Sequence, residues 1–495
     1  MTQPAAAPRP FQPVASPRDV SPWKEECGVS GVLRTDGADA APLVHVALYA
    51  LQHRGQESAG IAAMADATMT LHRGMGLVAQ VFDSERIALL PGPVAIGHVR
   101  YATMGSVSLE NAGPFVAPSP WGPVAISHNG NLINAPALRR ELEIQGVSFV
   151  GTTDTEIIAH LIARTSAATV EDAIAGCMHR IEGAYTIAAC AEGRLYAFRD
   201  AHGLRPLAVG RGPSFWAVAS ETCAFDHTGA EALSEVEPGE LVTMDAGGMR
   251  TRQILYVRRR AHCVFEYIYF ARPDSVLQNL NVHQARRRMG RILAREYPAQ
   301  ADIVIAVPDS GTSAAMGYAE GSGLSFDVGL IKNRYIGRTF IQPDQAVRDF
   351  GVRLKLNPNV EVIAGRRVVL VDDSIVRGTT SARIVRLLRA AGAREVHMRI
   401  SSPPIRHACF YGIDTSSRGE LVASRLDVEQ IRRMIGADTL GYLSQEGLIE
   451  ALGLDRDTLC MACLDGRYPT RVPTEDEAGR TALDTFVPAS VGTRS

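Results

Sequence analysis

The sequence predicts an α+β domain followed by an α/β domain with a parallel sheet of the doubly wound type. The chain has 495 residues, which is enough for two or three domains. Residues 27 to about 250 contain many short β-type runs and Gly turns with few helical stretches, which favours a layered α+β domain. From residue 300 onward, short apolar runs alternate with amphipathic stretches, which is typical of parallel strands joined by helices.

The first half contains four apolar runs that predict strands separated by turns. These runs cover residues 92–103, 122–132, 184–190 and 215–220. The stretches 42–52 and 154–165 have helical character. Strands with a few intervening helices therefore account for this half.

The second half repeats a strand, a polar loop and a helix. The apolar runs 302–307 and 366–371 each lead into a polar loop. A helix is expected over 382–392, and Gly392 is placed to end it. One face of this helix consists of Ile384, Val385, Leu387 and Leu388. Residues 394–400 then alternate like a strand.

The composition is that of an ordinary globular chain, with 46% hydrophobic and 21% charged residues. A net charge of -2 gives no reason to expect a nucleic-acid or membrane partner, and no apolar run is long enough to span a bilayer. The first two dozen residues are rich in Pro and Ala and lack the apolar core of a secretory signal. We therefore expect a cytoplasmic protein with a flexible leader and a flexible tail at 471–495.

The chain has eight cysteines. Without an export signal the compartment is reducing, so structural disulfides are not expected. Cys177, Cys190 and Cys223 lie among apolar or small residues and are predicted to pack in the core. The other five remain available as reactive thiols, metal ligands or further core residues.

The segment 368–381 is the most informative in the second half. A buried strand carries two adjacent carboxylates, Asp372 and Asp373, to its carboxyl end. A turn with Gly378 follows, and Thr379 to Ser381 open a helix whose backbone N–H groups can face a phosphate. Carboxylates beside a phosphate are useful when they hold sugar hydroxyls or Mg²⁺. A helix cap followed by a solvated acidic turn would have the same composition.

Two further loops favour the phosphate interpretation. The loop 308–313 has the composition of a second phosphate cradle, and residues 332–343 form a cation-rich loop that could act as a lid. Arg353 and Lys355 add positive charge suited to a diphosphate.

These loops resemble the signature of type I phosphoribosyltransferases, which bind 5-phosphoribosyl 1-diphosphate with magnesium. The resemblance implies that Asp372 and Asp373 hold the ribose hydroxyls and magnesium. It implies that Gly378, Thr379 and Ser381 hold the 5-phosphate. The loop of Asp309, Ser310 and Gly311 would face the diphosphate and the metal, and Lys332 would also bind this substrate.

Cys27, in the segment 26–32, resembles an ordinary core cysteine when it is considered alone. Four later segments each place polar groups next to Gly: 52–60, 97–105, 127–132 and 151–156. Together with Cys27 they resemble class II glutamine amidotransferases. These belong to the N-terminal-nucleophile hydrolases, which implies an αββα sandwich for the glutaminase domain.

The resemblance implies that Cys27 is the first residue of the mature chain. A free α-amine has a pKa of about 7.7–8.0 and can act as the base for the thiol. While residues 1–26 are attached, that nitrogen is an amide. We therefore expect residues 1–26 to be a propeptide that is removed.

The same family implies roles for the polar residues of the four segments. Asn129 and the backbone N–H of Gly130 stabilise the oxyanion. Arg100 binds the carboxylate of glutamine and Asp154 binds its ammonium group. Arg54 lies in a loop that orders over the bound glutamine.

A glutaminase joined to a phosphoribosyltransferase is similar to the amidophosphoribosyltransferases. The resemblance covers roughly residues 24–470 and implies a glutaminase domain at 27–258 and a phosphoribosyltransferase domain at 259–470. The implied reaction opens purine synthesis: it converts phosphoribosyl diphosphate, L-glutamine and water into phosphoribosylamine, glutamate and diphosphate. Ammonia would pass from Cys27 to the ribosyl carbon. The family also implies purine nucleotides as feedback inhibitors and a homotetramer.

The spacing of Cys460 and Cys463 is that of a redox or zinc pair. With Cys263 and Cys409 they lack a compact zinc spacing and fit an iron–sulfur site at least as well. All four positions resemble the branch of the family that carries a [4Fe–4S] cluster and a cleaved propeptide. That resemblance implies a structural cluster.

Three other functions compete with this interpretation. A sugar-phosphate aminating enzyme would need a different synthase domain from the one that 368–381 indicates. A regulator that only senses phosphoribosyl diphosphate would lack the glutaminase residues and would usually carry a DNA-binding element. An inactive member of the family would keep the motifs without turnover.

Overall fold

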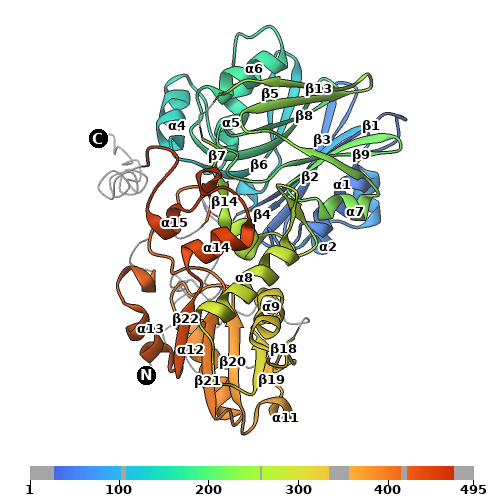
Figure 1. The fold of residues 1–495 in the computed structure, drawn as a ribbon. Coiled ribbons are helices and arrows are strands. Elements are labelled where there is room, and N and C mark those ends of the chain that lie inside the picture. The colour runs from blue at the N-terminus through green and yellow to red at the C-terminus, as the bar shows by residue number, and fades with distance from the viewer. Residues whose placement is uncertain (1–26, 102–107, 257–258, 334–355, 414–420, 473–495) are drawn as a thin grey trace, which may run out of the picture.

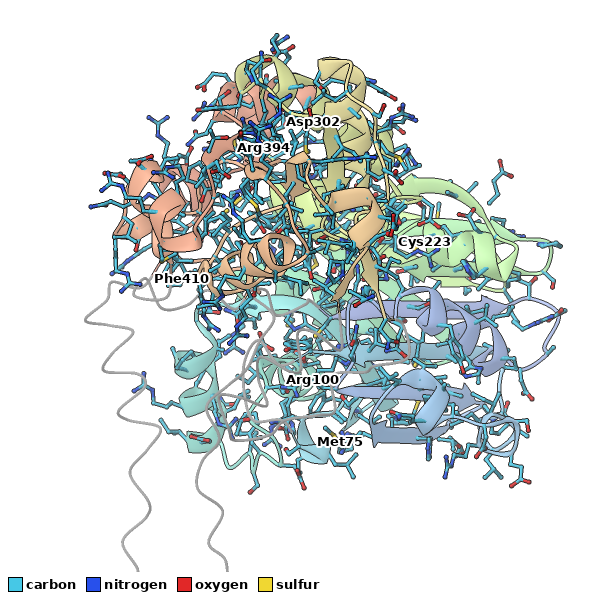
Figure 2. All side chains as sticks on the ribbon, turned by 90° about the horizontal axis from the view of Figure 1, so that it is seen from below. Met75, Arg100, Cys223, Asp302, Arg394 and Phe410 are labelled. Carbon is cyan, nitrogen blue, oxygen red and sulfur yellow. The ribbon has the colours of Figure 1, made fainter. Side chains whose placement is uncertain are left out.

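The computed structural model describes residues 27–101, 108–256, 259–333, 356–413 and 421–472. The proposed leader, most of the cation-rich loop 332–343, Arg353 and Lys355 and nearly all of the tail lie outside these residues. Figure 1 shows two bodies, one from the first half of the chain and one from the second half. Figure 2 shows Arg100 in the first body, away from Asp302 and Arg394 in the second.

The first domain contains two antiparallel sheets. The seven-stranded sheet has the order β11 (Glu231–Glu235), β9 (Ala208–Gly212), β10 (Phe215–Ala219), β1 (Gly28–Arg34), β4 (Val94–Arg100), β2 (Ser58–Ala65) and β3 (Thr68–Met75). The six-stranded sheet has the order β13 (Gly248–Gln253), β12 (Glu240–Asp245), β8 (Arg194–Arg199), β7 (Gly183–Ala191), β6 (Gly122–Leu132) and β5 (Phe115–Ser119). Every pairing in both sheets is antiparallel.

Apolar side chains from both sheets meet in one buried layer, which includes Val29, Ile96 and Ala188. The helices α1 (Ala41–Ala50) and α7 (Cys223–Thr228) pack on the outer face of the first sheet with Ala95 and Val99. The helices α4 (Ala135–Ile144), α5 (Asp154–Ala163) and α6 (Val170–Met178) pack on the second sheet. Two short helices, α2 (Val78–Val81) and α3 (Ser84–Ala88), and the turn η1 (Leu109–Asn111) complete the domain. The predicted αββα sandwich is confirmed.

The second domain is built on a four-stranded parallel sheet. Its order is β17 (Ile303–Ala306), β20 (Arg367–Asp372), β21 (Glu395–Ile400) and β22 (Thr439–Tyr442). On one face lie α8 (Val282–Glu296), α9 (Thr312–Ser322) and α14 (Gln445–Leu452); on the other lie α12 (Thr379–Ala390) and α13 (Val428–Ile435). Successive residues of β20 alternate between the two faces, so Val369 and Val371 meet the first group and Val368 and Leu370 the second. Helices on both faces confirm the predicted doubly wound arrangement.

Several short strands and helices lie outside the main sheets, and some of them connect the two domains. In the connection, β14 (His262–Cys263) pairs in parallel with β23 (Leu459–Cys460), and the π-helix η2 (Glu266–Phe270) follows. Two short antiparallel pairs are formed by β15 (Val276–Leu277) with β16 (Leu280–Asn281) and by β18 (Leu330–Lys332) with β19 (Leu356–Pro358). The remaining short helices are α11 (Val360–Ile363), η4 (Val422–Ser424), η5 (Arg456–Thr458) and α15 (Ala462–Asp465).

The apolar face predicted for 382–392 is the buried face of α12. Ile384, Val385 and Leu388 are at most 1% exposed, and Leu387 is partly buried beside them. The helix ends at Ala390, and Gly392 follows with a φ of +91°, which suits glycine. The three cysteines assigned to the core, Cys177, Cys190 and Cys223, are buried as predicted. No helix in the described parts of the chain is long and apolar enough to cross a bilayer.

Candidate active sites

Four of the residues predicted for the glutaminase meet in one pocket of the first domain, whereas Asn129 and Arg54 do not belong to its lining. Its lining includes Cys27, Arg100, Gly130 and Asp154. Cys27 directly precedes β1, Arg100 ends β4, Gly130 lies in β6 and Asp154 begins α5. Strands from both sheets and a helix thus bring together residues that lie more than 120 positions apart in the sequence. The lining is completed by His98, Tyr101, Asn111, His128, Thr153 and Thr155.

The thiol of Cys27 is half-buried and donates to the carbonyl oxygen of Tyr101 over 3.6 Å. Burial raises the pKa of this thiol to about 11, and the nearby Arg100 guanidinium only partly offsets that rise. Little thiolate exists at neutral pH in this form, so Cys27 needs a base before it can act as a nucleophile. A free α-amine on the same residue would be suitably placed for this role.

Asn129 and Gly130 have the features that an oxyanion site requires. Asn129 is 1% exposed, and its Nδ2 amide has no hydrogen-bond partner in the structure. A buried donor without a partner costs free energy unless a ligand accepts from it. Gly130 has a φ of +145°, and a Cβ atom there would lie 2.0 Å from the carbonyl oxygen of Ala184. Only glycine fits at this position.

Asp154 and Arg100 supply opposite charges at the pocket. The Asp154 carboxylate accepts from the Leu132 N–H over 2.9 Å and lies 3.5 Å from Nδ1 of His128. Burial favours the neutral acid, but these partners outweigh it and lower the pKa of Asp154. Arg100 is 4% exposed and lies 4.0 Å from the carboxylate of Glu57. A fixed carboxylate and a fixed guanidinium suit the two charged ends of an amino acid.

The side chain of Arg54 lies outside the lining of the Cys27 pocket. The guanidinium is fully buried, and it pairs with Glu221 and Glu266 instead. Only the adjacent backbone approaches the site, since a Cβ atom on Gly55 would lie 2.5 Å from the backbone nitrogen of Arg100. Both acceptors are carboxylates, so the charge of Arg54 is neutralised away from the pocket. Because Glu221 belongs to the first domain and Glu266 to the second, Arg54 links the two domains.

Two histidines of the pocket were not predicted as site residues. His98 is 3% exposed, and its ring makes a hydrogen bond to the backbone of His128. Burial, the charge of Arg100 and the proximity of His128 lower the pKa of His98 to about 3, so the ring is neutral. His128 instead lies against Asp154. Both stand inside the segments 97–105 and 127–132, so proximity to the predicted residues was the available signal.

The predicted acceptor site lies at the carboxyl ends of β17 and β20. Asp372 and Asp373 are 8% and 4% exposed, and Ser310 hydrogen-bonds to Asp373. A Cβ atom on Gly311 would lie 2.6 Å from the carbonyl oxygen of Val371, so the 308–313 loop packs directly against the end of β20. The structure therefore brings together the two loops in which the sequence predicted phosphate-site residues.

The two carboxylates strongly affect each other. Burial and the neighbouring charge of Asp373 raise the pKa of Asp372 well above its usual range. Burial also raises the pKa of Asp373, although Ser310 and Ser374 oppose the rise. A pair of buried acids with raised pKa values is characteristic of a functional site that awaits a cation or a hydrogen-bond donor.

The remaining acceptor residues surround this pair. Gly378 has a φ of +77° and precedes α12, which begins at Thr379 and contains the buried Ser381. The ammonium group of Lys332 lies 2.9 Å from the carboxylate of Asp309 and so joins the β18 hairpin to the 308–313 loop. Lys332 and Asp309 are 47% and 66% exposed, so solvent reaches this side of the site.

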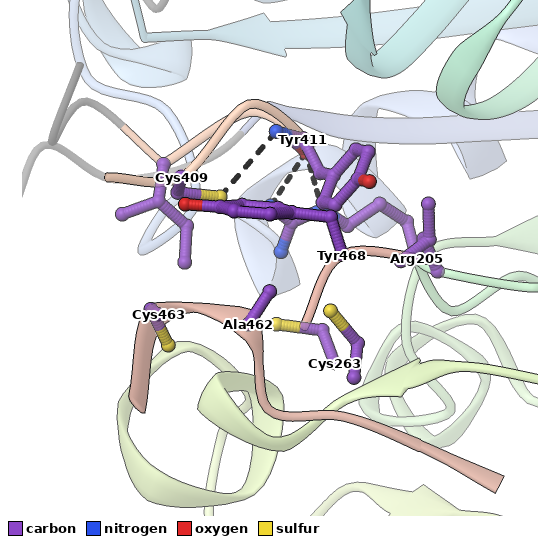
Figure 3. Close-up of a pocket in the computed structure, with 10 residues that line it drawn as sticks. Arg205, Cys263, Cys409, Tyr411, Ala462, Cys463 and Tyr468 are labelled. Carbon is purple, nitrogen blue, oxygen red and sulfur yellow. Dashed lines mark hydrogen bonds between the residues drawn. The ribbon is translucent and has the colours of Figure 1, made fainter. Parts of the chain in front are cut away.

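The four cysteines of the predicted cluster line one cavity between the domains. Figure 3 shows Cys263, Cys409 and Cys463 around it, and Cys460 belongs to the same lining. None of the four forms a disulfide, and Cys263 stands directly opposite Cys460 in the β14–β23 pair. Burial and the other three thiols raise the pKa of Cys463 well above its usual range. A raised pKa means that the buried thiolate form is unfavourable. Four thiols in one small enclosed cavity can be stabilised as thiolates by binding metal.

Single-ion coordination is a separate test of these cysteines. Across the parts of the chain that the structure describes, no three His, Cys, Asp or Glu side chains converge on the position of one metal ion. A structural zinc needs four ligands on one ion. In a [4Fe–4S] cluster each cysteine binds a different iron, so the sulfurs need not converge on one point. The lack of convergence on one point therefore does not exclude a cluster, which fits these cysteines at least as well as zinc.

Comparison with known proteins covers both domains. The glutamine amidotransferase domain family matches residues 98–227, and the phosphoribosyl transferase domain family matches residues 273–401. Amidophosphoribosyltransferase of Bacillus subtilis is 49% identical over 92% of this chain and 96% of its own length. The enzyme of that name from Methanothermobacter thermautotrophicus is 48% identical over 91% of this chain and 96% of its own length.

A solved structure gives the same result in three dimensions. The glutamine phosphoribosylpyrophosphate amidotransferase of B. subtilis, solved in complex with ADP and GMP, superposes with a TM-score of 0.86 at 49% identity. The match covers 91% of this chain and 98% of that one. Identity at this level over nearly the whole chain, with both domains matched, shows that the protein belongs to the amidophosphoribosyltransferase family.

Proposed function

We propose that the protein converts 5-phosphoribosyl 1-diphosphate, L-glutamine and water into 5-phosphoribosylamine, L-glutamate and diphosphate, the first step of purine biosynthesis. The observation that carries this proposal is the presence of two different sites in one chain. One is a closed pocket with a cysteine and fixed charges, and the other is a set of strand-end loops with two carboxylates. Family membership supports the same reaction.

In the glutaminase half-reaction, the Cys27 sulfur attacks the amide carbon of glutamine, and the thiol proton passes to the free α-amine. That amine then gives the proton to the departing nitrogen, which leaves as ammonia and a thioester remains. Water hydrolyses the thioester and releases glutamate. Asn129 and Gly130 donate to the oxyanion in both steps. Arg100 and Asp154 hold the carboxylate and the ammonium group of the substrate.

This mechanism requires the peptide bond before Cys27 to be broken, because an amide nitrogen cannot accept the thiol proton. We therefore include removal of residues 1–26 in the proposal. Mass spectrometry of the active protein should find Cys27 as its first residue. Full glutaminase activity in a chain that still carries residues 1–26 would contradict this part.

In the acceptor half-reaction, Asp372 and Asp373 hold the ribose hydroxyls, and Gly378, Thr379 and Ser381 bind the 5-phosphate at the start of α12. Lys332 and the 308–313 loop face the diphosphate. Asp372, Asp373 and Ser310 offer the hard oxygen atoms that Mg²⁺ prefers, and Mg²⁺ would neutralise charge on the leaving diphosphate. Ammonia then attacks the ribosyl carbon as diphosphate leaves. Because the site is in the same chain as Cys27, ammonia can be used before bulk water protonates it.

The nitrogen source separates the two half-reactions in one experiment. Replacing Cys27 with Ala should abolish synthesis from glutamine and leave synthesis from concentrated ammonium salts unchanged. The assay measures phosphoribosylamine and diphosphate from each nitrogen source. Retained use of glutamine in the Cys27→Ala protein would overturn the assignment of the nucleophile.

A [4Fe–4S] cluster at Cys263, Cys409, Cys460 and Cys463 is the second part of the proposal. Such a cluster would join the connection between the domains to the end of the second domain. Protein purified without oxygen should contain about four irons per chain. Cys409→Ser should lose this iron, whereas Cys177→Ser, at a buried cysteine outside the cavity, should keep it. Stoichiometric zinc would reject the cluster.

Regulation, assembly and compartment complete the proposal. The superposed relative was solved with ADP and GMP, and a second solved relative is described as the allosteric regulatory enzyme of purine biosynthesis. We infer feedback inhibition by purine nucleotides, which titration with ADP and GMP in the synthesis assay tests. We also infer a homotetramer, which light scattering tests. Eight cysteines that form no disulfide suit a reducing compartment such as the cytoplasm.

A further inference from the structure

A loop of the second domain contacts the strand that carries the oxyanion residues. The Nδ2 amide of Asn131 donates to the carbonyl oxygen of Phe410 over 2.9 Å, although the two residues lie 279 positions apart. A Cβ atom on Gly412 would lie 3.3 Å from the carbonyl carbon of Gly130 and 3.4 Å from its Cα. The loop 409–412 therefore covers the backbone of Gly130, and Asn131 fixes it there.

The same loop is held from its other side. Arg205 is fully buried, and its Nε and Nη2 atoms donate to the carbonyl oxygen of Tyr411 over 3.0 and 2.6 Å. Its Nη1 atom lies 3.5 Å from the carboxylate of Glu266, at the start of the second domain. The backbone N–H of Tyr411 donates to Sγ of Cys409 over 3.4 Å. The loop is thus tied both to the cysteine cavity and to a buried charge network.

We propose that Asn131 and Gly412 are positioning residues for the glutaminase reaction, because they hold Gly130 where its N–H meets the oxyanion. This inference rests on the role proposed above for Gly130. Asn131 does not line the Cys27 pocket, so its effect acts through its neighbour. Oxyanion donors must be placed within a fraction of an ångström, and a small displacement reduces the rate steeply. One domain therefore completes the active site of the other.

The direct test is Asn131→Ala in the full-length, processed protein. The kcat for glutamine-dependent synthesis should fall about tenfold. The KM for glutamine should stay within about twofold, because Arg100 and Asp154 still bind it. Synthesis from ammonium salts should be unchanged, since it does not use the oxyanion site. Gly412→Ala should act in the same direction, because its Cβ atom would press on Gly130 and its φ of +110° disfavours a side chain.

A matched control separates positioning from general damage. Asn134 makes a similar bond, since its Nδ2 donates to the carbonyl oxygen of Arg180 over 2.8 Å, but this bond stays within the first domain. Asn134→Ala should keep kcat within about twofold. A γ-aldehyde analogue of glutamine, which forms a tetrahedral adduct with a thiol, should bind Asn131→Ala about tenfold more weakly and Asn134→Ala unchanged.

Several results would overturn the inference. These are an unchanged kcat in Asn131→Ala, an equal loss of ammonium-dependent synthesis, or an equal loss in Asn134→Ala. If Asn131→Ala does not fold, the same measurements are made on Asn131→Asp. This variant keeps the shape of the side chain and replaces the amide donor with an oxygen that faces the Phe410 carbonyl. Failure of the proposed function is distinguishable, because the unmodified protein would then make no product from glutamine.

Discussion

The Cys27 pocket and the Asp372–Asp373 acceptor site differ in how far their charged residues are buried and balanced by partners within the protein. The Cys27 pocket is closed by two sheets, and its charged residues are nearly all buried, with Arg100 at 4% and Asp154 at 5% exposure. The acceptor site lies at strand ends, where Lys332 and Asp309 remain 47% and 66% exposed. The charged groups of the first site already have partners within the protein. The second needs its substrate and cation to balance two buried carboxylates with raised pKa values.

The largest effect that this comparison predicts is at the acceptor carboxylates. Replacing Asp372 and Asp373 together with Asn should reduce synthesis on the order of 10³-fold, because two charge-assisted interactions with the substrate or cation are lost. The loss should be the same with glutamine and with ammonium salts. Steady-state assays with both nitrogen sources measure it. A loss confined to glutamine would place these residues in the wrong half-reaction.

A smaller effect is expected at the buried Cys27 site. Gly130→Ala should reduce glutamine-dependent kcat by about 10²-fold, because the new Cβ atom would collide with the Ala184 carbonyl and displace the oxyanion donor. Ammonium-dependent synthesis and iron content serve as controls for folding, and both should persist. Normal use of glutamine by this variant would show that the backbone N–H of Gly130 does not meet the oxyanion.

Asp154→Asn should affect binding of glutamine rather than turnover. Asn keeps the shape but removes the charge that faces the substrate ammonium group, so the KM for glutamine should rise by tens of fold, as for one charged hydrogen bond of about 2 kcal/mol. Initial rates over a range of glutamine concentrations give KM and kcat separately. An unchanged KM would contradict the role assigned to this carboxylate.

The smallest effect concerns stability and pH. The folded pKa of His98 is lowered to about 3, below the ordinary value of about 6.5 in the unfolded chain. The unfolded chain therefore binds the extra proton first, and stability falls as pH falls below about 6.5. Between pH 6.5 and 5 this one group should remove about 2 kcal/mol from the free energy of unfolding.

Denaturant unfolding at the two pH values tests this expectation. His98→Gln should lose that part of the pH dependence, and the exposed His179→Gln should keep it. An unaltered pH dependence in His98→Gln would mean that the ring is not held neutral in the folded protein.

Contiguity in the sequence explains which features were predictable. Asp372, Asp373 and Gly378 lie in one short segment between a strand and a helix, so a local pattern was sufficient to find them. The Cys27 pocket needed resemblance, because its residues come from five separate segments. The order of the strands in the two sheets was not predictable, since pairing between distant strands depends on the whole core.

The contacts that the sequence did not predict have a common physical cause. Arg54 lies in a segment that resembles a glutaminase motif, but its partners Glu221 and Glu266 are more than 160 positions away. The contact between Asn131 and Phe410 joins the two domains, and no local pattern carries such information. Residues whose roles depend on packing between domains are visible only in the folded molecule.

The central claim is that nitrogen released at Cys27 is used at the Asp372–Asp373 site. The most direct measurement supplies glutamine labelled with ¹⁵N in its amide, together with phosphoribosyl diphosphate and unlabelled ammonium in the solution. We expect phosphoribosylamine whose nitrogen carries the label even when unlabelled ammonium is in excess. Product that carries only the unlabelled nitrogen, while glutamine is hydrolysed at the same time, would show that the two sites do not share one reaction.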